Sequence, residues 1–60
     1  MKDILLARAA HFRQRAVAAN RSAEASTTDD LRLSYEGLAH RWTGLAELLE
    51  AAAAPAVEGF

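Results

Sequence analysis

The sequence predicts an all-α protein, an antiparallel hairpin of two helices, and three observations carry this prediction. Two long stretches carry apolar side chains at alternating steps of four and three residues, the spacing of one helical face. A short polar segment, residues 26–29, separates them. The chain has 60 residues and no cysteine, so it forms at most one small domain, without disulfides.

The first helix is expected over residues 3–25. This stretch is rich in Ala, Leu, Arg and Gln, which are strong helix formers, and neither Gly nor Pro interrupts it. Asp3 stands in the first turn, where a negative charge favours the helix dipole. Small side chains dominate the apolar stripe, so a partner helix can approach closely. The stripe consists of Leu5, Ala9, Phe12, Ala16, Ala19 and Ala23.

The turn is expected at residues 26–29, where short polar side chains compete with helical hydrogen bonds. Thr27 is the predicted N-cap of the second helix, with Asp30 three residues later as a variant of the capping box. A connection this short implies that the two helices are antiparallel neighbours.

The second helix is expected over residues 28–54 and ends before Pro55, which leaves residues 55–60 as a tail. Its apolar stripe holds the only Trp and the only Tyr of the chain. The stripe consists of Leu31, Tyr35, Leu38, Trp42, Leu45 and Leu49.

Folding one stripe onto the other pairs positions that share a midpoint at residue 27, inside the predicted turn. Phe12 then faces Trp42 at the centre, while small residues of the first helix face leucines of the second, as an interdigitated core requires. The predicted core consists of Leu5, Phe12, Tyr35, Leu38, Trp42 and Leu45.

Charge also favours this pairing. Residues 1–25 carry five basic and two acidic side chains, a net charge of +3, whereas residues 26–60 carry two basic and six acidic ones, a net charge of −4. Neighbours of opposite sign suit each other. We expect ion pairs between Arg8 and Glu47 or Glu50, and between Arg21 and Asp30.

Apolar and small residues remain outside the two stripes and predict a partner interface. Gly37 and Gly44 lie seven residues apart on one side of the second helix, where a groove lets another backbone come close; the alternative is a solvated side without a role. We expect self-association, with two hairpins forming a four-helix bundle. The interface is expected at Leu6, Val17, Gly37, Gly44 and Leu48.

No chemical site is predicted: we expect no catalytic residue, no cofactor site and no metal site. The sequence has no nucleophile elbow, glycine-rich phosphate loop or paired acidic site. His40 follows Glu36 by four residues, and we expect a hydrogen-bonded surface pair. The rarer alternative is a metal site of His11 and His40 completed by Glu36.

The segment Leu33-Ser34-Tyr35-Glu36-Gly37-Leu38-Ala39, with Arg13, Ala16 and Ala19 upstream, resembles a set of short, uncharacterised bacterial proteins. These combine a helix rich in Arg and Ala, a brief polar turn and a Leu-Ala-x-x-Tyr-Glu-x-Leu-Ala helix. Ser34 stands where Ala is usual. The resemblance covers most of the chain and implies a helical hairpin, but it implies no activity.

Together these features predict a non-enzymatic helical interaction or regulatory module that self-associates. The alternatives are an accessory subunit of a larger complex and a nucleic-acid-binding protein that uses Arg8, Arg13, Arg15 and Arg21. No stretch has the length of a membrane span, and the apolar run from Ile4 stops at Arg8, unlike a secretory signal. We therefore expect a cytoplasmic protein without membrane contact, with a transit peptide in the first 23 residues as the alternative.

Overall fold

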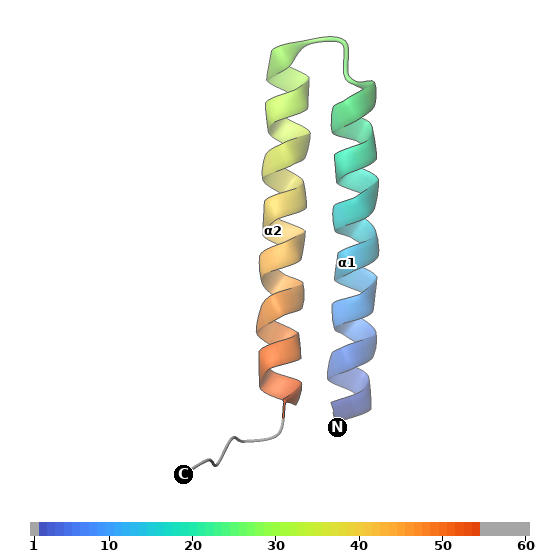
Figure 1. Cartoon of the computed structure of the whole chain (residues 1–60), viewed down its shortest axis with the longest axis vertical. Coiled ribbons are helices and arrows are strands. Elements are labelled where there is room, and N and C mark those ends of the chain that lie inside the picture. The colour runs from blue at the N-terminus through green and yellow to red at the C-terminus, as the bar shows by residue number, and fades with distance from the viewer. Residues whose placement is uncertain (1, 55–60) are drawn as a thin grey trace.

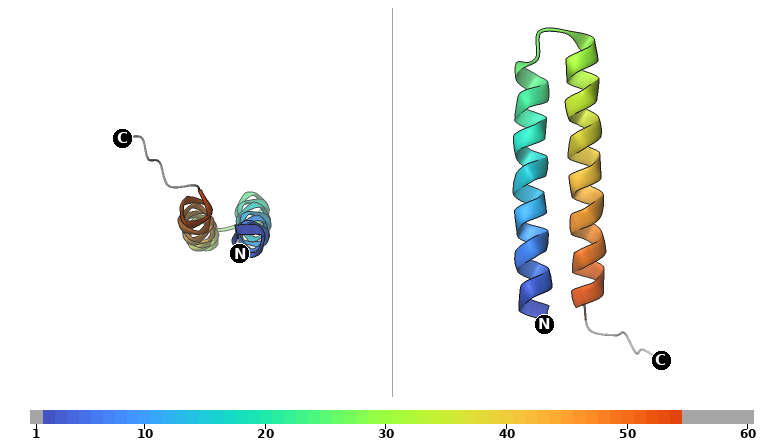
Figure 2. Two further views of the ribbon diagram at one scale, coloured as in Figure 1. Left: turned by 90° about the horizontal axis from the view of Figure 1, so that it is seen from below. Right: turned by 180° about the vertical axis from the view of Figure 1, so that it is seen from behind.

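The computed structural model describes residues 2–54, which form two antiparallel helices side by side (Figure 1). Helix α1 spans Lys2–Ala25 and α2 spans Asp29–Ala53. The predicted helical hairpin is confirmed, and both helices begin and end within one residue of their predicted bounds. The predicted tail, residues 55–60, lies outside the described residues. Seen from the end, the helices form a single layer, so both broad faces of the hairpin are uncovered (Figure 2).

The connection is held by short polar side chains. The Ser26 hydroxyl donates a 2.7 Å hydrogen bond to the Ser22 carbonyl, and the Ser26 amide donates a 3.2 Å bond to the Ala23 carbonyl, so carbonyls at the end of α1 are satisfied. The N-cap of α2 is Thr28 rather than the predicted Thr27, and its hydroxyl accepts a 3.2 Å bond from the Leu31 amide.

The corrected cap also removes the predicted capping box, because the third residue after Thr28 is a leucine instead of an acid. The two acids of the first turn, Asp29 and Asp30, still favour the helix dipole. At the other end, Ala54 adopts the extended conformation expected of a residue before proline (φ −67°, ψ 143°).

The contact between the helices is built from alanines. No side chain larger than a methyl group is fully buried within residues 2–54, and the larger apolar residues at the contact are half-buried. Phe12 and Trp42 stack with ring centroids 5.4 Å apart and planes inclined by 21°, so the predicted central layer is confirmed. The buried residues are Ala9, Ala16, Ala19, Ala23, Ala39, Ala46 and Ala53.

The predicted core is wrong for two leucines of α2. Leu38 and Leu45 are 41% and 42% exposed, and the buried positions belong to Ala39 and Ala46, one residue further along. Relative to the predicted stripe, α2 is rotated about its axis by roughly 40°. The physical reason is close packing: alanines on both helices let the backbones approach, whereas leucines at the contact would hold them apart.

Candidate protein interaction surface

A row of exposed leucines runs along α2 beside the helix contact. Leu31, Leu38 and Leu45 are seven residues apart, so they share one side of the helix, and they are 48%, 41% and 42% exposed. We call these three residues the leucine row. The half-buried rings of Tyr35 and Trp42 lie between the row and α1. Trp42 stacks on Phe12 of α1, and Tyr35 lines a hollow together with Ser22 of α1 and Leu31 of the row.

Two interactions show which side chains share each broad face of the hairpin. The Arg15 guanidinium lies 5.7 Å from the centroid of the Trp42 ring, while Arg13 pairs with Glu50. Residues two apart on a helix point in nearly opposite directions. Arg15 and Arg13 therefore mark opposite faces.

The Arg15 side carries the leucine row, since a hollow at its turn end is lined by Ser22, seven residues after Arg15, together with Leu31 and Tyr35. We call this side the leucine face. The Arg13 side is the polar face. Asn20, seven residues after Arg13, lies there beside Glu36, His40 and Thr43 of α2.

The polar face carries a bidentate ion pair, Arg13 with Glu50, that joins the two helices. Arg13 donates from Nε and from one terminal nitrogen to the two carboxylate oxygens of Glu50, at 2.6 and 2.7 Å. The hydrogen bond from Arg13 lowers the pKa of Glu50, and the bond to Glu50 raises the pKa of Arg13. Both side chains are partly exposed, so solvent weakens the contribution of this pair to stability.

The predicted ion pairs differ from those in the structure. Within residues 2–54, the pairs are Arg13 with Glu50 and Arg32 with Asp29, at 2.6 and 3.0 Å. Arg8 lies seven residues before Arg15, on the leucine face, and therefore points away from the acids that were its expected partners.

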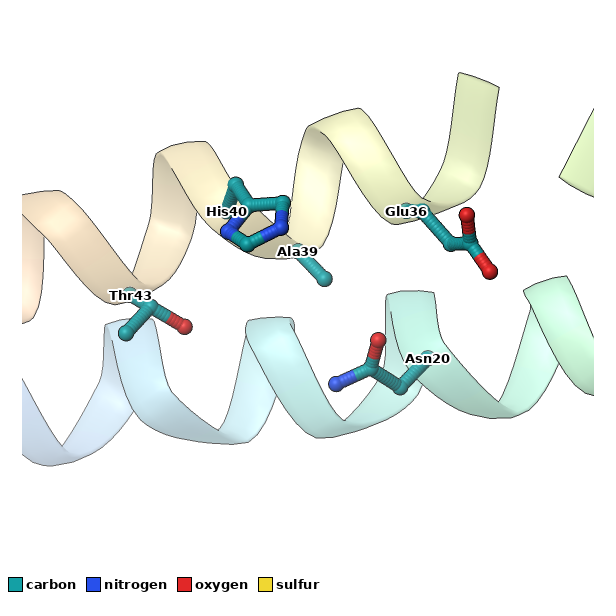
Figure 3. A pocket seen from close by; sticks show the side chains of 5 residues that line it. All are labelled: Asn20, Glu36, Ala39, His40 and Thr43. Atoms are coloured by element: carbon teal, nitrogen blue, oxygen red, sulfur yellow. The ribbon is translucent and has the colours of Figure 1, made fainter. Parts of the chain in front are cut away.

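A hollow on the polar face contains Glu36 and His40, two of the three residues of the alternative metal site. Figure 3 shows Asn20 lying over α1 with its amide oxygen on the side of α2, and Glu36 and His40 on either side of Ala39. Among the residues that the structure describes, no hydrogen bond joins Glu36 to His40, and no group of three metal-ligating side chains occurs. His11 lies instead on the leucine face, where Arg15 Nε donates to it at 3.4 Å. The hairpin thus does not bring the two histidines together.

The residues of the predicted interface do not form one surface. Leu6 and Val17 are exposed, and their spacing from Arg13 places them toward the polar face. Leu48, also exposed, follows Leu45 by three residues and borders the leucine face. A Cβ added at Gly37 or Gly44 would have no described atom within 4 Å apart from its chain neighbours and the adjoining backbone of α2, so α1 does not occupy their side of α2.

The arginines proposed for nucleic-acid binding are likewise divided. Arg8 and Arg15 belong to the leucine face. Arg13 forms its ion pair on the polar face, and Arg21 lines the same hollow as Arg13 and Val17. A single basic strip along α1 is therefore absent from residues 2–54. Comparisons with known proteins add no further guide, since no family model, curated protein or solved structure matches the chain. Neither described helix is long and apolar enough to cross a membrane.

The leucine row was not predicted as a surface, because the four-and-three spacing places all three leucines at the helix contact. A signal was present in the alanines of α2. Ala39, Ala46 and Ala53 repeat every seven residues and match the small residues of the α1 stripe, so they offered a closer contact than the leucines did.

Proposed function

We propose that the chain is a non-enzymatic helical interaction module whose leucine face packs against a further helix. The exposed leucine row is the observation that carries this proposal. Contiguous apolar side chains on the surface of a small protein mark interaction sites, and a heptad row of leucines is the pattern that helix–helix contacts use.

The contact between α1 and α2 buries little apolar surface and so contributes little stability. This supports a role for the leucine row in binding a further helix. The buried side chains are single methyl groups, and the large apolar side chains stay half-buried or exposed. Complete burial of a leucine contributes about 1.5–3 kcal/mol, so covering leucines that are nearly half exposed would contribute roughly 1 kcal/mol each. A third helix would also cover the open edges of Tyr35 and Trp42.

Two forms of this module use the same row. In the form predicted from the sequence, a second copy supplies the helix, and two hairpins build a coiled-coil-like four-helix bundle. In the other form, the chain is an accessory subunit and a different protein supplies the helix. Both require the leucine face to be covered in the working complex.

Site-specific photo-crosslinking in the native cells tests the module. A photoreactive amino acid is placed at Leu38 and, as the matched control, at Leu33, which is 60% exposed and lies four residues before Gly37, away from the row. We expect a discrete adduct from position 38 and none from position 33. An adduct of twice the chain mass indicates self-association, and a larger one indicates an accessory subunit. Equal labelling from both positions, or none from either, contradicts the module.

A pair of charge variants shows whether the row serves docking or folding. Leu38→Glu and Leu33→Glu add the same charge to exposed positions of α2, so both should keep the helical content of the natural chain, measured by circular dichroism. Only Leu38→Glu should abolish the adduct from a crosslinker placed at Leu45. Loss of helical structure in Leu38→Glu alone would assign the row to folding.

A further inference from the structure

We propose that the helix covering the leucine face belongs to another protein and carries acidic side chains on both flanks of its apolar stripe. This inference rests on the proposed function, and it identifies the partner by the charges that border the leucine row.

Basic side chains border the row on both sides. Arg8 and Arg15, seven residues apart, line the leucine face on α1, and the Arg15 guanidinium lies over the Trp42 ring. Arg41 stands on the far border, three residues after Leu38 and four before Leu45. A helix that lies on the row would therefore meet arginines along both of its flanks.

Within residues 2–54, these arginines have no acidic partner. The ion pairs there engage Arg13 and Arg32 and include none of the three arginines that border the leucine row. Beyond the first turn of α2, its described acids lie toward the polar face. Glu36 borders the polar hollow, Glu50 binds Arg13, and Glu47 precedes Glu50 by three residues.

The same charges disfavour a second copy as the occupant. Packing two leucine faces together would bring Arg8, Arg15 and Arg41 of both copies into one interface. Against these three arginines each copy would supply one described acid, Asp30, which stands eleven residues before Arg41 on the same side of α2. Like charges across an interface oppose association, whereas complementary flanks select a partner and speed its encounter. A partner with glutamates or aspartates at its flanks instead turns the three arginines into interhelical ion pairs, as charged flanks do in coiled coils.

The row also sets the size of the partner. Leu31 and Leu45 are fourteen residues apart, which corresponds to about 21 Å along α2. A partner helix of roughly four turns spans this distance and presents apolar anchors at i, i+3, i+4 and i+7. At the turn end, the hollow lined by Leu31, Tyr35, Ser22 and Ser26 is available to the side chain of one end anchor.

Two synthetic peptides test the proposal with the full chain. Both carry the same leucine stripe over about 15 residues, the roughly four turns that the row spans, and contain no tryptophan; one has glutamates at the flanks and the other has lysines. Since Trp42 is the only Trp of the chain, its fluorescence reports occupation of the leucine face. We expect the acidic peptide to bind about tenfold or more tightly than the basic one, and its affinity to fall as salt is raised.

Variants of the chain assign the effect to the named residues. The triple variant Arg8→Gln, Arg15→Gln, Arg41→Gln should lose most of the difference between the peptides, while Arg21→Gln, away from the leucine face, should preserve it. Because Arg15 lies against Trp42, binding to the triple variant is measured by sedimentation as well as by fluorescence.

The outcomes separate this inference from the module itself. Equal binding of both peptides, or unchanged preference in the triple variant, overturns the acidic partner. A crosslinked dimer from Leu38 that forms in preference to the acidic complex overturns it too, while it supports a self-associating module. Binding of the acidic peptide that survives Leu38→Glu contradicts the docking surface and hence the proposed function.

Discussion

The two helices of the hairpin use their apolar residues differently. Helix α1 has one apolar stripe, and this stripe lies at the helix contact as its spacing predicts. Helix α2 has two adjoining rows, one of alanines and one of leucines, with aromatic residues between them. Helix α1 packs against the alanines of α2, and the leucines remain exposed. An apolar stripe therefore predicts that one side of a helix is buried, but the sizes of its side chains decide which residues contact the neighbouring helix.

This division of α2 explains why the hairpin has unequal faces. The alanine row of α2, formed by Ala39, Ala46 and Ala53, lets the two backbones approach and determines the fold. The leucine row remains exposed along one broad face. The ion pair of Arg13 with Glu50 crosses the opposite face. Substitutions in the alanines, in the central ring, in the turn and on the polar face test this division.

Enlarging the alanine row should break the contact. Ala46 is 0% exposed, so Ala46→Leu forces the helices apart or rotates α2, and overpacking of this kind costs about 2–3 kcal/mol. Urea unfolding followed by circular dichroism measures the loss of stability. Ala51→Leu adds the same side chain at an exposed position of α2 and should change the stability by less than about 0.5 kcal/mol. Equal effects of both variants would contradict an alanine contact.

Removing the large ring between the two rows should cost slightly less. Trp42 stacks on Phe12 but is only half-buried, so Trp42→Ala should lower the free energy of unfolding by about 2 kcal/mol, below the 3–5 kcal/mol typical of a fully buried ring. The same unfolding measurement checks this value. Trp42→Phe keeps the stacked ring and should recover most of the loss; failure to do so would show that the stack is not the stabilising contact.

Much of this fold could be predicted from the sequence. The helix-favouring composition, the polar turn and the proline after Ala54 determine the elements, and the common midpoint of the two stripes predicts the layer of Phe12 and Trp42. The rotation of α2 could not be derived from hydrophobicity alone. Leucine ranks above alanine on any apolar scale, whereas backbone approach favours the alanines. The candidate surface was missed for the same reason, since a leucine placed at the contact cannot also be outside it.

The turn offers a smaller effect with an internal control. Thr28→Ala removes the side chain that accepts from the Leu31 amide and should cost about 1 kcal/mol. Thr27→Ala changes the neighbouring threonine, which is not the cap, and should have almost no effect on the midpoint of urea unfolding. An equal cost at both positions would indicate that the cap is shared or displaced.

Substitutions at the glycines of α2 separate effects on the stability of the hairpin from effects on its association with a partner. A Cβ at Gly37 or Gly44 meets nothing within 4 Å, so each change to alanine should stabilise the hairpin by about 0.5–1 kcal/mol through helix propensity. A rise in the thermal midpoint checks this expectation.

Gly44→Leu should remain helical, and a loss of association in this variant would show that the partner needs close approach on this side of the helix.

The smallest expected effect concerns the polar face and depends on pH. The hydrogen bond from Arg13 lowers the pKa of Glu50 in the folded chain, so the folded state holds this proton less tightly than the unfolded state does. The contribution of the pair is therefore present at neutral pH and is lost as the pH falls through the pKa of Glu50 in the acidic range. Urea unfolding of the natural chain and of Glu50→Gln should differ at pH 7 and converge in acid. A gap that stays constant with pH would mean that the carboxylate charge does not contribute, and high salt should narrow the gap at pH 7 because the pair is partly exposed.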